Sequence, residues 1–356
     1  MAFSTINKGS SFMNSVLYNS NGTAIGSGWL TVTGFDFQPD WLGLKQRDAA
    51  ESWGTYDTVR GVEKSLRFNG NNAEDTRTEG VTTFNSSGFI CGSDSRINPS
   101  GTHPCVAYGW KANGAGSANT DGTINSTVSA NSTSKFSIVS YTGTATAGTI
   151  GHGLGVAPKM IIVKILDEPY SWYTTTTDIG WVKTMYLEDT NGVSAGDTTI
   201  WNNTAPTSSV FSVGSNNDVN KSGSGLIAYC FADVVGYSKS GLFTGNGNAN
   251  GTFVYTGFGI SWLLIKKTNA SGTYWTIWDK ARTNNSGNYG NPAGKILHPN
   301  VANAENAGSV DEIDFLSNGF KVRNSVNGVN GSGDTHLYLA FGQPIISNGG
   351  VSATAR

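Results

Sequence analysis

The residues with which metal or nucleophilic chemistry usually begins are sparse in this chain. Four histidines and three cysteines are present: His103, His152, His298, His336, Cys91, Cys105 and Cys230. None forms a His-x-His, His-Glu-x-x-His or Cys-x-x-Cys pattern, the spacings with which one element presents two ligands to a metal ion. We therefore expect no metal site and no cofactor, and we interpret His103 and His336 as turn or strand-entry residues.

Carboxylate pairs and phosphate-binding loops are also weakly indicated. A glycan-degrading enzyme needs two carboxylates across the bond that it cleaves. The densest acidic group, residues 311–314, stands just ahead of an expected strand, and we interpret it as a solvated loop. Glycine-rich residues 151–155 and 245–248 do not complete a phosphate-binding fingerprint and are predicted to be turns. We assign no catalytic residue, and the sequence identifies no binding residue.

Two Asp-x-x-Arg pairs follow tryptophan-containing segments. They are Asp57 with Arg60 and Asp279 with Arg282, and the corresponding place near residues 175–178 lacks the pair. A group essential to function would less readily be missing from one of several equivalent places. We predict that these are surface or loop-bracing ion pairs, worth about 0–1 kcal/mol if exposed.

An apolar run that ends in lysine recurs three times and shows how the chain is organised. It occupies residues 41–45, 160–164 and 262–266, follows a glycine-containing turn, and precedes a segment with a second aromatic group. A period of about one hundred residues corresponds to a whole domain and not to one turn of a solenoid.

A second marker closes each unit. Phe89, Phe211 or Phe320 comes first, followed by a polar stretch that we expect to form a hairpin, and then by a last apolar run. That run occupies residues 106–110, 227–231 and 337–341. Alternation with a period of two predicts strands. Large residues on one face of the last run and small ones on the other predict a mid-sheet strand packed closely against another layer.

The pattern predicts an all-β fold of three tandem antiparallel β-sandwich, jelly-roll-like repeat domains. We place an N-terminal arm at 1–11, repeats at 12–112, 134–235 and 236–343, a linker at 113–133 and a C-terminal tail at 344–356. The linker is rich in Asn, Ser, Thr and Gly, and we expect it to be extended or flexible. Helical periodicity is confined to residues 301–313.

Alignment of the repeats gives the cysteines a packing role. Cys91 stands where the other repeats have valine, Cys105 where one has leucine, and Cys230 where they have glycine or alanine. We therefore expect small, buried hydrophobic residues. An odd count leaves at least one thiol unpaired, which suits synthesis in a reducing cytosol, and a Cys91–Cys105 bridge remains an alternative.

Most of the tryptophans also fall at positions shared by the repeats. Shared positions favour a role in the core, and this set consists of Trp41, Trp53, Trp172, Trp262 and Trp275. Tyr170 and Tyr289 lie in segments specific to one repeat, where an exposed ring could stack on a sugar.

Composition supports the β assignment and limits the partners. Charged residues make up 13% of the chain, the net charge is −2, and 47 residues are glycine. With no basic patch we expect no nucleic-acid partner. No apolar run approaches the roughly 18 residues that span a bilayer, so we expect no membrane insertion. The N-terminal residues contain no apolar stretch typical of a secretory signal.

Several segments resemble the repeat modules of virion structural proteins, often tail-fibre-like, from marine and cyanobacterial tailed bacteriophages. The segments that carry the resemblance are residues 1–6, 136–143, 151–164, 204–211, 314–321 and 354–356. The resemblance covers nearly the whole chain, implies a place in the virion, and supplies no catalytic motif. The first repeat departs from the others at residues 103–105, which leaves open a docking role for it.

We therefore expect a non-enzymatic virion protein, a tail fibre or appendage component that takes part in host attachment. A capsid decoration or head-fibre protein is the alternative, and a glycan depolymerase ranks lower because no pair of acids stands out. The expected partners are other virion proteins, further copies of this chain and host cell-surface glycan.

Overall fold

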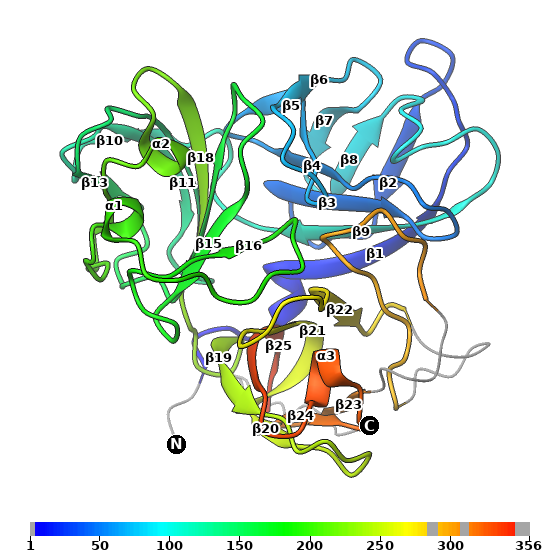
Figure 1. The fold of residues 1–356 in the computed structure, drawn as a ribbon. Coiled ribbons are helices and arrows are strands. Elements are labelled where there is room, and N and C mark those ends of the chain that lie inside the picture. The colour runs from blue at the N-terminus through cyan, green and yellow to red at the C-terminus, as the bar shows by residue number, and fades with distance from the viewer. Residues whose placement is uncertain (1–3, 283–290, 307–312, 346–356) are drawn as a thin grey trace.

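The computed structural model describes residues 4–282, 291–306 and 313–345, and they form an all-β protein of several antiparallel sheets (Figure 1). Strands form at the apolar runs of the sequence, as predicted. The lysine-ending runs become β3, β14 and β21, and every residue of β3 and β14 is buried. Such strands lie inside a sheet that is covered on both faces.

Segment 1 (residues 12–112) contains one large and one small sheet. The large sheet has the order β1 (Met13–Asn19), β9 (Pro104–Trp110), β3 (Trp41–Gln46), β4 (Gly54–Asp57), β5 (Gly61–Leu66) and β6 (Asp75–Thr76). The small sheet has the order β2 (Leu30–Thr33), β8 (Gly88–Cys91) and β7 (Val81–Asn85). A short 3-10 helix, η1 (Gly9–Ser11), precedes β1.

Segment 2 (residues 134–235) is extended by strands from the preceding residues. Its large sheet has the order β10 (Ser117–Asn119), β11 (Ser126–Asn131), β12 (Phe136–Thr142), β18 (Gly225–Phe231), β14 (Met160–Ile165), β15 (Tyr173–Thr176) and β16 (Met185–Tyr186). The small sheet pairs β13 (Gly148–Gly151) with β17 (Val210–Val213), and two short helices are α1 (Thr198–Trp201) and α2 (Asn217–Asn220).

Segment 3 (residues 236–343) is the last of the three. Its larger sheet has the order β19 (Ser238–Thr244), β25 (Thr335–Pro344), β21 (Phe258–Lys267) and β22 (Thr276–Asp279). The smaller has the order β20 (Phe253–Tyr255), β24 (Gly319–Val322) and β23 (Ile313–Leu316), and one short helix is α3 (Asn327–Asn330).

The same four-stranded arrangement occurs in all three segments. The last strand of each segment, β9, β18 or β25, lies between the first strand and the lysine-ending strand, and the strand that follows the lysine pairs on the outside. The predicted mid-sheet position of the last strand is thus confirmed. Its small-residue face, such as Ala107, belongs to the segment's own core, and its large-residue face, such as Tyr108, belongs to a cluster that all three segments share.

Two local predictions are wrong. Residues 113–133 are not a free connector, because β10 and β11 lie within them and β11 pairs with β12 over its whole length. The polar stretch before each last strand is not a hairpin, because the strands that it joins, such as β17 and β18, belong to different sheets. Alternation shows which residues are strands but not which strands pair.

The predicted helix at residues 301–313 is also absent where it can be checked. Residues 301–306 are not helical, residues 307–312 lie outside the described chain, and Ile313 begins β23. Among the described residues, no helix is long and apolar enough to cross a bilayer.

Candidate functional site

The centre of the molecule is an aromatic cluster to which all three segments contribute. The last strands end in Trp110, Phe231 and Phe341, and their ring centroids lie 5.5–6.4 Å apart in a triangle. Trp41, Trp53, Trp172, Trp262 and Trp275 belong to the same buried cluster, so their predicted core role is confirmed. Aromatic pairs at this spacing add to the free energy gained from burying their surface.

Each segment also donates one indole hydrogen bond to a neighbouring segment. Trp53 Nε1 donates to the carbonyl of His298 at 3.0 Å, which joins segment 1 to segment 3. Trp172 Nε1 donates to the carbonyl of Arg67 at 2.9 Å, and Trp275 Nε1 donates to that of Tyr186 at 3.0 Å. The three bonds run in one sense around the cluster, from 1 to 3, from 3 to 2 and from 2 to 1.

The Asp-x-x-Arg pairs lie in this interior, so the prediction of surface pairs is wrong. The loop-bracing alternative is confirmed, because Asp57 Oδ1 and Asp279 Oδ1 each accept two backbone N–H bonds from the turn that follows them. The Asp279 carboxylate lies 2.6 Å from Nε of Arg282, and both side chains are fully buried. Asp57 and Arg60 make the same contact at 2.5 Å, with almost no exposure. A buried carboxylate needs such a partner, because an unpaired charge in a dry interior is costly.

A tyrosine from a neighbouring segment completes each pair. The Tyr108 hydroxyl donates to Asp279 at 2.7 Å, and the Tyr229 hydroxyl donates to Asp57 at 2.8 Å. Burial raises the pKa of both phenols well above the ordinary value, so they remain donors. The sequence analysis missed these tyrosines, although the third repeat, which has Leu339 in their place, offered a signal. The tyrosine of segment 1 meets the aspartate of segment 3, and the tyrosine of segment 2 meets the aspartate of segment 1. In the same order Leu339 of segment 3 corresponds to segment 2, which also lacks the Asp-x-x-Arg pair.

The three strand-ending lysines are buried, and among the described residues none of them forms an ion pair with a carboxylate. Lys45 Nζ donates to the carbonyls of Gln46 and Ala49, and Lys164 Nζ makes the equivalent bonds. Lys266 Nζ donates to Thr273 of its own segment and, at 2.9 Å, to Thr190 of segment 2. Burial lowers the pKa of each of the three amines to about 8.

The cysteines are buried and free, as the packing interpretation predicted, so no Cys91–Cys105 bridge is present. Burial raises the pKa of Cys91 and Cys230 to about 12 and that of Cys105 to about 11, which suppresses the reactive thiolate.

The histidines do not converge on one site. His152 and His336 are buried in segments 2 and 3, and His103 accompanies Asp48 at the surface of segment 1. Among the described residues, no group of three or more His, Cys, Asp or Glu is placed to hold a metal ion.

The remaining candidate residues also do not come together in one site among the described residues. Asp314 lies in β23 and pairs with Arg323 at 3.3 Å, whereas Asp311 and Glu312 lie outside the described residues. Tyr170 is half-buried against the core of segment 2, with Lys221 over its ring, and Tyr289 lies outside the described residues.

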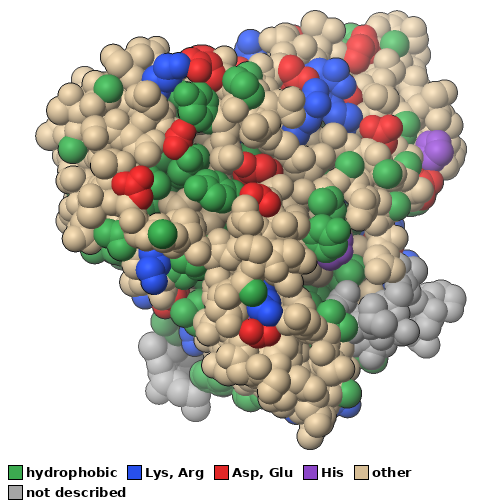
Figure 2. Space-filling view, viewed as in Figure 1, with side chains coloured by type: hydrophobic (Ala, Val, Ile, Leu, Met, Phe, Trp, Pro, Cys, Tyr) green, Lys and Arg blue, Asp and Glu red, His purple; other side chains and the backbone are tan. Residues whose placement is uncertain are grey.

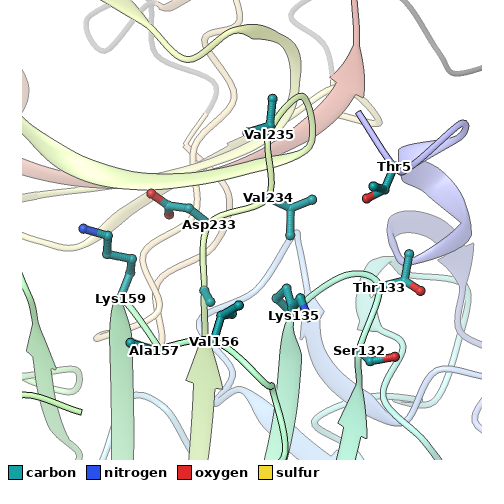
Figure 3. A pocket seen from close by; sticks show the side chains of 11 residues that line it. Thr5, Ser132, Thr133, Lys135, Val156, Ala157, Lys159, Asp233, Val234 and Val235 are labelled. Carbon is teal, nitrogen blue, oxygen red and sulfur yellow. The ribbon is translucent and has the colours of Figure 1, made fainter. Parts of the chain in front are cut away.

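A hollow of about 630 Å³ lies where segment 2, the residues just before it and the N-terminal residues meet (Figure 3). Asp233 and Lys159 lie on one side of it, and Thr5 and Thr133 on the other. Asp233 accepts a hydrogen bond from the Ser240 N–H, and Lys135 Nζ donates to the carbonyl of Leu154. With one carboxylate and no histidine or cysteine in its lining, the hollow offers no pair of groups for acid–base or nucleophilic catalysis.

The surface carries small charged groups of both signs between large uncharged areas (Figure 2). One exposed aromatic pair stands out in segment 3, where Phe253 and Tyr255 are 46% and 57% exposed on β20. The strands at the same position in the other segments have exposed Thr31 and Thr33 in β2, and half-buried Thr149 and buried Gly151 in β13. The pair is therefore specific to segment 3.

Comparison with known proteins gives one match. The family model described as Domain of unknown function (DUF7483) covers residues 8–344, which includes all three segments. Neither the curated proteins nor the solved structures give a match. The chain therefore belongs to the DUF7483 family.

Proposed function

We propose that this protein is a non-enzymatic structural component of a tailed-phage particle, built from three tandem antiparallel β-sandwich repeats, and that it takes part in host attachment. The observation that carries the structural role is the burial of the residue types that could be chemically reactive. Carboxylates, arginines, lysines and thiols that sequence alone would offer for chemistry are buried, and many of them join one segment to the next.

Three observations support the repeat architecture. The large sheets share one strand order, the indole hydrogen bonds recur at matching positions, and Trp110, Phe231 and Phe341 meet around one point. Each repeat then packs a large sheet against a small one and closes with its two neighbours around an approximate threefold axis. One family model spans all three repeats, which is expected if the closed set is the unit of the fold.

The phage role is supported by the resemblance of the repeat segments to virion proteins, and the exposed pair Phe253 and Tyr255 supports attachment. The pair stands on a rigid strand, where ring faces are available to stack on sugars. Lys239 Nζ lies 5.9 Å from the centroid of the Tyr255 ring, over one of its faces, and supplies a polar donor beside it.

The test has two parts. Antibody against the protein should label purified particles, and the position of the label on the tail or the head separates an appendage from a capsid decoration. Purified protein should adsorb to host cells, and Phe253→Ser with Tyr255→Ser should reduce adsorption at least about tenfold, a loss on the order of 1.4 kcal/mol. The matched control replaces Thr31 and Thr33 by alanine. Unlabelled particles would contradict the phage role, and unchanged adsorption would contradict the aromatic contact.

A further inference from the structure

The first strand of each segment lies at the same place in its sheet, beside the last strand. These strands are β1, β12 and β19, and each has one edge that the last strand does not occupy. An open edge presents unpaired backbone N–H and C=O groups to any extended chain that approaches it. The molecule treats its three equivalent edges in three different ways.

The edge of β12 is covered by the chain itself. Strand β11 pairs with it antiparallel over six residues, from Ser126 opposite Tyr141 to Asn131 opposite Phe136. This strand demonstrates that an added strand fits at this position of the repeat.

The edge of β19 is obstructed. The Ser238 N–H donates to the carbonyl of Val234 at 3.0 Å, and the Ser240 N–H donates to the Asp233 carboxylate at 2.9 Å. The strand also carries Lys239. Charges and occupied donors are common devices that keep an edge strand from pairing with another chain.

The edge of β1 is the least protected of the three among the described residues: the Ser15 N–H donates to the Asn14 Oδ1 of the same strand at 3.0 Å, and the strand carries no charge. The strand reads Met-Asn-Ser-Val-Leu-Tyr-Asn, without a charge or a proline, and among the described strands it pairs only with β9. The Ser20 N–H donates to the carbonyl of His103, and the Lys111 N–H donates to that of Phe12. Because alternate residues of an antiparallel pair bond to the partner strand, the even-numbered residues of β1 face β9. The backbone groups of Ser15, Leu17 and Asn19 therefore point away from β9. The Leu17 side chain is 43% exposed.

We propose that the edge of β1 is a docking surface for β1 of a second copy of this chain, added antiparallel about a twofold axis at Leu17. The pairing continues the sheet of segment 1 into the sheet of its partner. It places the two Leu17 side chains opposite each other and so removes exposed apolar surface.

Three features favour a second copy as the occupant. The strand is uncharged, so two copies meet without like-charge repulsion. An antiparallel pair about a twofold axis is self-complementary, because each copy offers the donors and acceptors that the other needs. The N-terminal half of β1 borders a hollow of about 200 Å³ that it shares with Ser261 and Ala281 of segment 3, which leaves the half around Leu17 as the freer edge.

This inference rests on the strand correspondence among the segments and not on the phage role. The full-length chain is therefore studied in isolation, by sedimentation velocity over a range of concentrations. We expect a dimer for the unchanged protein, and Leu17→Lys should weaken dimerisation at least about tenfold. The matched control is Leu242→Lys, because Leu242 occupies the same position on the obstructed β19 and is 39% exposed; its dimer should persist.

A crosslink fixes the geometry. Directly opposed residues in a hydrogen-bonded antiparallel pair have Cα atoms about 5.5 Å apart, which suits a disulfide. Leu17→Cys should therefore yield a covalent dimer on mild oxidation, and Leu242→Cys should not. The three native thiols are buried and do not compete. A protein that stays monomeric up to its solubility limit, or a dimer that Leu17→Lys leaves intact, would overturn the proposal.

Discussion

Segment 3 contacts both segment 1 and segment 2. At matching positions the contact with segment 1 has charged residues and the contact with segment 2 has uncharged ones. In the first, Tyr108 donates to Asp279, which pairs with Arg282, and all three side chains are buried. In the second, the matching positions hold Leu339, Thr176 and Ile179. Both sides of the second contact have therefore changed together, although they belong to different segments.

The comparison indicates that the ionic triad and the uncharged residues at the matching positions fill the same place in the fold in different ways. Replacing a buried ion pair by apolar groups of similar volume is often neutral or stabilising, whereas removing one partner is not. The apolar contact is not without polar links, because Lys266 reaches the carbonyl of Thr190 across it. The triad therefore occupies a packing position between two segments.

The largest expected effect comes from breaking the triad. Asp279→Ala leaves Arg282 buried without its main partner, and we expect a loss of about 3–5 kcal/mol in the free energy of unfolding. Urea denaturation measures the loss. Thr176→Ala, the same position in segment 2, should cost less than about 1 kcal/mol. Equal losses at the two positions would contradict the distinction between the two contacts.

Converting the triad to the other chemistry should cost less than breaking it. The variant Tyr108→Leu, Asp279→Thr and Arg282→Ile introduces the residues of the contact between segments 2 and 3. We expect it to fold and to lose no more than about 2 kcal/mol, because no charge of the triad is left unpaired. Glu305 keeps Arg47 as its partner. If this variant proves less stable than Asp279→Ala, the two sets are not interchangeable.

These contacts mark the limit of what the sequence could predict. The shared spacing of Phe89, Phe211 and Phe320, with the strands around them, was enough to find the segments and the core tryptophans. An Asp-x-x-Arg spacing looks the same in an exposed turn and beneath a neighbouring segment, so it predicts surface or loop-bracing pairs for Asp57 and Asp279 and does not reveal their burial. Their burial depends on packing between segments that are distant in sequence.

Strand pairing failed for a related reason. In residues 126–131 only Val128 and Ala130 are apolar, so the alternation is a weak signal, and their pairing with β12 is set by a free edge that only the folded sheet reveals. Propensity in strands depends on such context more than it does in helices.

The features that the segments share should respond equally to mutation. Trp53→Phe, Trp172→Phe and Trp275→Phe each remove one indole donor and leave a part-buried carbonyl without it. We expect a loss of about 1–3 kcal/mol for each, measured by thermal and urea unfolding. Trp172 Nε1 also donates to the carbonyl of Gly70. The loss in unfolding free energy for Trp172→Phe, compared with the other two losses, therefore tests whether the losses follow the number of hydrogen bonds removed. A negligible loss for all three would show that ring packing alone holds the segments together.

The smallest expected effect is a pH dependence at Lys266, the polar link of the contact between segments 2 and 3. Burial lowers its pKa to about 8 in the folded state, whereas an unfolded lysine titrates near 10.4. Between these values the unfolded chain binds more protons, so the contribution of Lys266 to stability rises as the pH rises through this window, and it is lost as the pH falls through 8. The neutral amine still has an N–H for each of its carbonyl acceptors. The gap in unfolding free energy between the native protein and Lys266→Met should therefore widen by about 1 kcal/mol from pH 8 to pH 9.5.

Taking the difference between the two proteins cancels the opposing titration of the buried thiols. Lys164→Met should show the same slope with a smaller loss at pH 8, because Lys164 bonds only within its own segment. A gap that narrows with pH would mean that the folded protein favours the charged amine at the contact.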